Sequence, residues 1–226
     1  MAMEISSVSY MKALPLVLIL LLTITQVKCS DPDPLQDFCV ADTNSTSFLN
    51  GFPCINPSTV NASQFKTPAL GVPGNTSANP FGFNVTLTTV QNLPGLNTQG
   101  LALARTDFAK GGLVPPHIHP RASEIAFVVK GVVLVGFVDT SNKLFTQNLK
   151  AGDVFVFPRA QLHFLLNLGN STAITISGLN SQSPGAQIVP LAAFGSNPEI
   201  PPAVLEKAFQ ISSEEVKKIR KNLIGG

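Results

Sequence analysis

The sequence has 226 residues, of which 44% are hydrophobic and only 12% are charged, and its formal net charge is +2. This composition excludes a disordered chain, because the apolar residues suffice for a large core. No cluster of lysine and arginine alternates with aromatic residues, so nothing indicates a nucleic-acid partner. The length fits one all-β barrel or two small domains and does not choose between them.

The N-terminus predicts a signal peptide. The apolar run 13–25 follows a lysine, has the length of a signal-peptide core and is too short to cross a bilayer comfortably. Val27 and Cys29 are small enough for the −3 and −1 positions, so we expect residues 1–29 to be removed and the mature chain to begin at Ser30. Cleavage one residue later fits less well, because it puts a lysine at −3. The alternative is a retained anchor, but no stop-transfer pattern and no second spanning stretch follow, so we expect no membrane span.

Removal of the signal peptide leaves two of the three cysteines, Cys39 and Cys54. An even pair in an oxidising compartment predicts one disulfide that closes a short loop. In the chain-entropy model such a loop contributes about 3 kcal/mol to stability. The alternative, two free buried thiols, does not suit a secreted protein.

N-glycosylation is a further expectation for a secreted chain. A proline after Asn56 disqualifies one Asn-x-Ser motif. The five remaining candidates are Asn44, Asn61, Asn75, Asn84 and Asn170.

The middle of the chain predicts an all-β domain. Residues 30–80 are rich in Pro, Asn, Ser and Gly, which is typical of an irregular arm pinned by the disulfide. After it, short apolar or alternating runs are separated by Gly, Pro, Asn or Ser, which indicates an antiparallel sandwich or barrel. These runs are 83–90, 100–108, 124–139, 143–150, 153–158, 163–169 and 172–179.

The C-terminal segment 200–226 differs, because it predicts helices. Two prolines can open a short helix at 203–210. Ser212 and Glu215 then have the spacing of a capping box, and a charged amphipathic helix follows with Gly225 as a possible stop. Such a tail either packs on its own core or clasps another subunit, and the sequence does not decide which.

All three histidines lie in two segments that predict a metal site. His117 and His119 are two residues apart, so on an extended strand their rings point to the same side. Glu124 opens an apolar run, where a carboxylate needs a partner, and His163 opens another after a turn at 158–161. The alternative is histidines satisfied by hydrogen bonds in the core or at the surface. This alternative would explain any single histidine well, but it explains less well why all three occur together with the glutamate at this spacing.

The donor set limits which metals can bind but does not identify one. Three imidazoles and one carboxylate, with no thiolate, suit Mn, Fe, Zn, Ni or Cu. Four protein ligands leave room for two waters in an octahedral site, which favours Mn or Fe over a closed tetrahedral zinc.

These two segments resemble the two motifs of the cupins. The first motif, G-x5-H-x-H-x4-E-x6-G, is complete from Gly111 to Gly131. The second, G-x5-P-x-G-x2-H-x3-N, runs from Gly152 to Asn167 with Ala160 in place of its glycine. Within the cupins, PPHIHPRASE is very similar to the germins and germin-like proteins of plants. So are the segments DPDPLQDFCVAD (31–42), NGFPC (50–54), SGLNSQSPG (177–185) and VPLAAFG (189–195).

The resemblance implies one cupin domain over residues 30–226, folded as a jelly-roll β-barrel with a short C-terminal helical extension. It implies one Mn2+ per subunit, with His117, His119, Glu124 and His163 at the matching ligand positions. It also implies the disulfide and a homohexamer, a trimer of dimers clasped by C-terminal helices. The location that it implies is the extracellular space, apoplast or cell wall.

Activities differ within the resembling family, so fold and metal do not settle the reaction. Germins are oxalate oxidases, whereas many germin-like proteins are described as superoxide dismutases. Val114 and Ala104 stand where oxalate oxidases have asparagines thought to hold substrate, and an oxalate dianion needs such donors. Leu165, where glutamine is common, makes the pocket more apolar. If the turn before His163 needs positive φ, Ala160 costs about 1 kcal/mol there.

The leading hypothesis is therefore a secreted manganese protein that dismutates superoxide to O2 and H2O2. A non-catalytic apoplastic binding or cell-wall protein is the second hypothesis. Another metal-dependent oxidase or hydrolase of small substrates is the third, with oxalate oxidase ranked below dismutase; no Gly-rich phosphate loop supports a nucleotide hydrolase.

Overall fold

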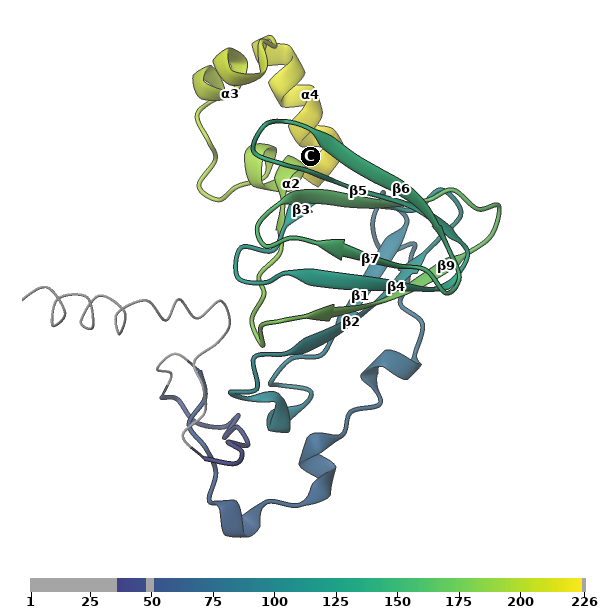
Figure 1. Cartoon of the computed structure of the whole chain (residues 1–226). Coiled ribbons are helices and arrows are strands. Elements are labelled where there is room, and N and C mark those ends of the chain that lie inside the picture. The colour runs from purple at the N-terminus through teal and green to yellow at the C-terminus, as the bar shows by residue number, and fades with distance from the viewer. Residues whose placement is uncertain (1–35, 48–50, 225–226) are drawn as a thin grey trace, which may run out of the picture.

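The computed structural model describes residues 36–47 and 51–224. The expected signal peptide and the helix stop at Gly225 lie outside these residues. Two five-stranded antiparallel sheets face each other (Figure 1), which confirms the predicted all-β jelly roll. The first sheet has the order β1 (Phe83–Leu87), β2 (Ala102–Phe108), β9 (Ala173–Leu179), β4 (Glu124–Lys130) and β7 (Val154–Phe157). The second has the order β10 (Gln187–Ile188), β3 (Leu113–Ile118), β8 (Leu162–Asn167), β5 (Val132–Val138) and β6 (Leu144–Lys150).

The apolar run 124–139 is two strands in different sheets. It divides at Gly131, whose φ of 94° is in the region that favours glycine. A Cβ at this position would lie 2.6 Å from the Cβ of Ala173, so a side chain does not fit. The chain therefore passes from the first sheet to the second at a residue that the first motif supplies.

Large apolar side chains fill most of the space between the sheets, as the alternation of the strands dictates. Phe108, Val128 and Val133 are fully buried, and Phe157 is 1% exposed. This cluster fixes the distance between the sheets.

The arm before β1 is irregular, as predicted. Within its described part it forms three short 3-10 helices, η1 (Pro57–Thr59), η2 (Ala62–Phe65) and η3 (Ala69–Gly71), and a fourth, η4 (Pro94–Leu96), follows β1. Cys39 and Cys54 form the expected disulfide, with 4.9 Å between their Cα atoms. An isolated antiparallel bridge between Ala41 and Cys54 lies beside it.

Three helices follow the barrel: α2 (Val189–Phe194), α3 (Pro202–Phe209) and α4 (Ser213–Ile224). The short apolar helix α2, of six residues, was not predicted from the sequence. Phe194, Leu205 and Val216, one from each helix, form a separate apolar cluster. Figure 1 shows these helices at one end of the sandwich and the arm at the other. The three helices of the tail thus pack on one another.

The predicted capping box is present before α4. The Ser212 amide donates to Glu215 Oε2 at 2.7 Å, and the Glu215 amide donates to Ser212 Oγ at 3.3 Å. This reciprocal pair satisfies backbone donors that the first turn leaves free.

Candidate metal centre

The four candidate ligands come from three neighbouring strands and one loop. His117 lies near the end of β3 and is paired across the sheet with His163 on β8. His119 follows β3 directly, and Glu124 is the first residue of β4 in the opposite sheet. The groups therefore approach one point between the two sheets from both sides.

A bulge in β3 turns His117 toward this point. The register between β3 and β8 shifts between Val114 and His117, where Pro115 and Pro116 lie. Prolines donate no backbone hydrogen bond, so the ladder cannot continue through them. The Pro115 carbonyl is left to accept a hydrogen bond from Nδ1 of His117 at 2.9 Å.

The four side chains form a compact buried group. One nitrogen or oxygen of each lies within 4.8 Å of the others. Nε2 of His119 is 3.0 Å from Oε2 of Glu124, and Nε2 of His163 is 3.4 Å from the same oxygen. His117, Glu124 and His163 are 5%, 7% and 2% exposed, so they are largely shielded from bulk solvent.

Backbone carbonyls fix the tautomer of every ring. Nδ1 of His119 bonds the Gly185 carbonyl at 2.5 Å, and Nδ1 of His163 bonds the Gln161 carbonyl at 2.8 Å, as His117 does with Pro115. A carbonyl oxygen only accepts, so Nδ1 carries the hydrogen in each ring and Nε2 of a neutral ring carries a lone pair.

This arrangement fits a cation. Three Nε2 lone pairs and a carboxylate that face one point repel one another unless a positive charge lies between them. Nε2 of His163 is buried and has no hydrogen-bond partner among the described residues. Imidazole nitrogens oriented through Nδ1 by a carbonyl, together with a carboxylate, are a common donor set for a divalent transition metal.

In the metal-free protein, burial and mutual contacts shift the pKa values of these groups away from their ordinary values. Burial, with repulsion from His163 and His119, lowers the pKa of His117 to about 3. Burial alone would lower the pKa of His119, but the hydrogen bond and charge of Glu124 outweigh it and raise that pKa. Burial would likewise raise the pKa of Glu124, yet its close interactions with His119 and His163 hold that pKa well below its usual range. The carboxylate thus stays charged in a buried place, which suits a metal ligand.

The turn before His163 adopts the conformation that its motif requires. Ala160 has φ 58°, so the residue in place of the motif's glycine is left-handed, as the sequence analysis considered. Its amide donates to the His119 carbonyl at 3.3 Å, which joins the two motifs through the backbone. Neither this bond nor the role of the Gly185 carbonyl was predictable from the sequence, because the partners in each bond are distant in the chain.

A cavity of about 930 Å3 opens beside the ligands. His117, His119 and Glu124 line it, together with the disulfide and Arg121. Apolar residues of its wall include Ala104, Val114, Leu165, Leu179 and Ile188, and the hydroxyl residues Thr106 and Ser177 also line it. The cavity has the size of a small-molecule site and gives a substrate access to the point where the ligands converge.

Comparison with known proteins assigns the family. The cupin family model matches residues 69–217. The germin-like protein subfamily 1 member 1 of Arabidopsis thaliana is 52% identical over 218 residues, which cover 93% of this chain and 100% of that protein. The germin-like protein 3-1 of Oryza sativa subsp. japonica is 52% identical and covers 92% of this chain and 96% of that protein. This chain belongs to the germin-like proteins of the cupin family.

Solved structures extend the comparison. An oxalate oxidase in complex with the substrate analogue glycolate superposes with a TM-score of 0.84 at 43% identity, covering 87% of this chain and 100% of that one. The resemblance predicted from the two motifs is therefore confirmed. In this germin-like chain, Ala104 and Val114 are both buried and both line the cavity.

The remaining predicted residues lie away from the site. Asn44, Asn61, Asn75 and Asn170 are exposed, whereas Asn84 is half-buried in β1 with Gly74 close to its amide. Across residues 36–47 and 51–224, no helix of this germin-like chain has the length and apolarity to cross a membrane.

Proposed function

We propose that this germin-like protein binds one manganese ion through His117, His119, Glu124 and His163 and dismutates superoxide. The observation that carries the proposal is the convergence of three tautomer-fixed imidazoles and one carboxylate beside an open cavity. The absence of a thiolate from this donor set favours manganese or iron over zinc held by cysteines, and two free octahedral positions suit either metal.

When bound, manganese would supply one-electron exchange, so that two superoxide ions and two protons yield O2 and H2O2. The chain's own groups prepare the site. Glu124 contributes one negative charge, which offsets part of the metal charge and favours the higher oxidation state. The Nδ1 hydrogen bonds hold the three rings in place, so little reorganisation is needed when the charge changes.

The cavity walls fit a substrate that needs few protein contacts. Superoxide is small and reaches an open coordination position without a dedicated donor from the wall. The wall residues Ala104, Val114 and Leu165 offer no side-chain hydrogen bonds. Protons for the peroxide reach the site from solvent through the same opening.

Oxalate oxidation is the second candidate, and the solved neighbours favour it. Oxalate oxidases superpose on this chain with a TM-score of 0.84 at 43–44% identity. In that reaction oxalate, O2 and two protons would give two CO2 and H2O2. A dianion at this site would meet apolar walls at Ala104 and Val114, which is our reason for placing dismutation first.

One preparation tests both candidates. The secreted protein is purified, its manganese, iron, zinc and copper contents are measured, and superoxide dismutation and oxalate-dependent H2O2 release are assayed on the same sample. We expect about one manganese per subunit and dismutation that disappears after metal removal and returns with manganese. A full metal site with no dismutation refutes the proposal, and oxalate turnover then selects the second candidate. Neither activity would favour a non-catalytic apoplastic binding or cell-wall protein.

Substitutions in the cavity wall test directly whether apolar side chains there disfavour oxalate. The double substitution Ala104→Asn and Val114→Asn adds two amides beside the ligands. We expect oxalate-dependent H2O2 release to rise about tenfold or more, because each buried donor discriminates by a few kcal/mol at most. Val85→Asn, on the solvent-exposed part of the cavity lining, is the control and should leave oxalate turnover unchanged. If wild type already turns over oxalate and the double variant does not exceed it, the wall argument fails.

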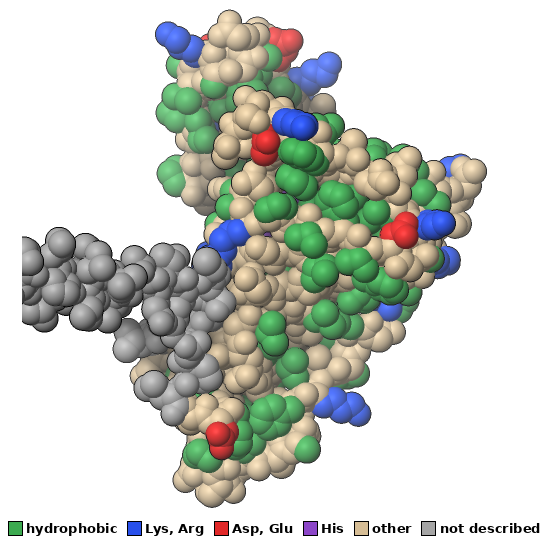
Figure 2. All heavy atoms as spheres, viewed as in Figure 1, with side chains coloured by type: hydrophobic (Ala, Val, Ile, Leu, Met, Phe, Trp, Pro, Cys, Tyr) green, Lys and Arg blue, Asp and Glu red, His purple; other side chains and the backbone are tan. Residues whose placement is uncertain are grey.

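We also propose that the mature chain, residues 30–226, is secreted to the apoplast or cell wall as an N-glycosylated homohexamer. The disulfide and the exposed sequons support secretion. Apolar side chains spread over the outer face of β4 and β7 support association with further copies (Figure 2). The exposed residues of that face are Ile125, Phe127, Val129, Val154 and Val156, each 43–54% exposed.

Light scattering on the purified glycoprotein tests the assembly, and glycopeptide mass spectrometry tests the sequons. We expect the mass of six subunits, and glycans at exposed sequons rather than at Asn84. Phe127→Glu should lower the mass, because a buried unpaired charge opposes association. A monomer in wild type would contradict the proposed assembly.

A further inference from the structure

One loop holds the segment that carries two of the four ligands. Residues 180–185 lie between β9 and β10 and run along residues 119–123, which join β3 to β4. The Arg121 amide donates to the Pro184 carbonyl at 3.1 Å, and the Ser123 amide donates to Asn180 Oδ1 at 2.7 Å. Since His119 is the first residue of this segment and Glu124 directly follows it, the loop sets the spacing between the two ligands.

The same loop orients a ligand ring directly. The Gly185 carbonyl accepts the Nδ1 hydrogen bond of His119. The Arg121 guanidinium adds bonds to the Ser183 carbonyl at 2.5 Å and to Ser183 Oγ at 3.2 Å. A movement of this loop would therefore rotate the His119 ring as well as shift its backbone.

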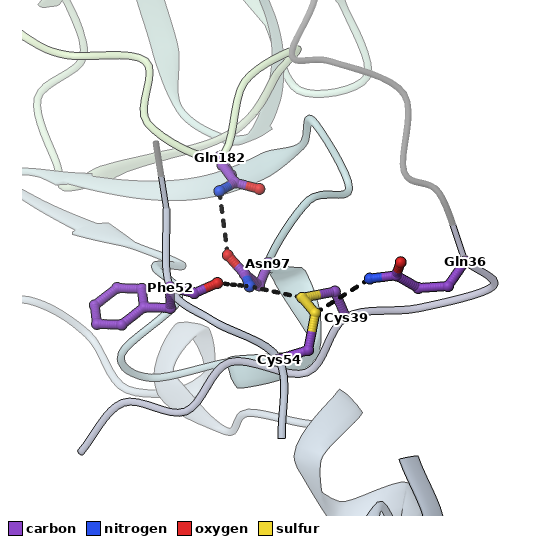
Figure 3. Close-up of a disulfide and its surroundings, with 6 residues drawn as sticks. All are labelled: Gln36, Cys39, Phe52, Cys54, Asn97 and Gln182. Carbon is purple, nitrogen blue, oxygen red and sulfur yellow. Dashed lines mark hydrogen bonds between the residues drawn. A yellow bond between two sulfur atoms is a disulfide. The ribbon is translucent and has the colours of Figure 1, made fainter. Parts of the chain in front are cut away.

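The opposite side of the loop contacts the disulfide-pinned arm through Asn97 (Figure 3). Asn97 follows η4 and is fully buried. Its Nδ2 donates to the Phe52 carbonyl at 2.9 Å and to Cys39 Sγ at 3.3 Å. Its Oδ1 accepts from Nε2 of Gln182 in the loop at 3.4 Å. Both ends of one buried amide are thus used, one toward the arm and one toward the loop.

We propose that Asn97 and Gln182 are positioning residues that relay the disulfide-held arm to the metal ligand His119. The inference rests on the proposed metal site, because its consequence is the affinity and geometry of that site. The arm fixes Asn97, Asn97 fixes Gln182, and the loop that contains Gln182 presents the Gly185 carbonyl to His119. Reduction of the disulfide releases the first link and loosens the last.

The relay is long: polar contacts join the arm to Asn97 and Asn97 to Gln182, and three residues of loop backbone join Gln182 to Gly185. Groups that orient metal ligands from outside commonly change metal affinity by about 10- to 100-fold when they are removed. Two steps lie between Asn97 and the carbonyl, so we expect a smaller effect, about 3- to 10-fold.

The test uses the purified mature protein loaded with Co2+, whose visible absorption reports ligand geometry, and with Mn2+ in competition with a chelator. Gln182→Ala is the first variant, because its side chain is only half-buried and its loss endangers folding least. Asn97→Ala is the second. Gln91→Ala, a glutamine that lines the same cavity outside the relay, is the matched control.

We expect Gln182→Ala and Asn97→Ala to bind metal about 3- to 10-fold more weakly, with an altered Co2+ spectrum, while Gln91→Ala matches wild type. Disulfide reduction should weaken metal binding in wild type and have less effect in Gln182→Ala, because the variant has already lost the link. A purely structural role would lower the melting temperature without removing this redox sensitivity.

The outcomes separate the two proposals. Wild type that binds neither metal refutes the metal site itself. Wild type that binds metal, with Gln182→Ala within twofold of it and the same spectrum and redox response, refutes the relay and leaves the metal site intact. If Asn97→Ala is not secreted, Gln182→Ala still decides.

Discussion

The two ends of the β-sandwich use the same sheets but side chains of different size. Away from the ligands, Phe108, Val128 and Val133 are fully buried and fill the space between the sheets. Around the ligands, the separate cluster consists mainly of small side chains such as Ala104 and Ala122. The packed end fixes the distance between the sheets, and the small residues leave room for four polar side chains and a cavity. A buried polar site is thus stable here because a neighbouring apolar cluster holds its walls apart.

The largest expected effect on stability comes from a substitution in the packed end of the sandwich. Phe108→Ala removes a fully buried ring and should lower the free energy of unfolding by about 3–5 kcal/mol, through lost burial and the cavity left behind. Denaturant unfolding of the metal-free protein measures it. Phe145→Ala is the matched control, since Phe145 is 37% exposed, stacks on Phe137 and has Lys143 Nζ 4.8 Å from its ring centroid; its loss should cost about 1 kcal/mol. Equal costs for the two rings would contradict the account of the core.

The next largest effect is on metal binding and comes from a substitution at the site end. His163→Ala removes one of the four proposed ligands and should weaken metal binding more than about 100-fold, abolishing the proposed dismutation with it. Metal content after dialysis and chelator competition measure the loss. Gln161→Ala keeps the backbone carbonyl that orients His163, so it should retain the metal and show that the ring itself is required. An unchanged metal content in His163→Ala would refute the site.

Acid should weaken the metal-free site end. The pKa of His117 is lowered to about 3 from its ordinary 6.5. Between these two pKa values the unfolded chain binds a proton at this histidine and the folded chain does not. The free energy of unfolding therefore falls as the pH drops from about 6.5 toward 3, and above that range it does not depend on this group. The expected loss is a few kcal/mol at most. Denaturant unfolding at pH 7, 5 and 4 measures it, and His117→Gln should show a shallower dependence. The same slope in both proteins would contradict the assignment.

Much of the site end was predictable from the sequence, because its signals are local. His117 and His119 share a side of an extended strand, and Glu124 stands where an apolar strand begins. The capping box of Ser212 and Glu215 was predictable for the same reason. Each of these patterns spans only a few residues, and spacing along a strand or a helix turn fixes the geometry.

Other features depend on contacts between distant segments and were not predictable. The carbonyl that orients His119 belongs to Gly185, 66 residues later in the chain. The division of the run 124–139 at Gly131 depends on the approach of Ala173. The short helix α2 has too few turns to show a helical period. In each case tertiary packing, rather than local preference, decides the conformation.

The smallest expected effect on stability comes from a substitution in the turn that joins the two motifs. Ala160 has φ 58°, a conformation that costs a residue with a Cβ about 1–2 kcal/mol and costs glycine nothing. Ala160→Gly removes this cost but adds freedom to the unfolded chain, so the net gain in stability should be about 0.5–1 kcal/mol. Ala151→Gly, in an exposed turn, is the control and should lose about 0.5 kcal/mol, because it adds the same freedom without relieving a left-handed residue. A loss in both variants would mean that the turn tolerates alanine without strain, and the amide bond from residue 160 to the His119 carbonyl would then owe its geometry to the surrounding strands alone.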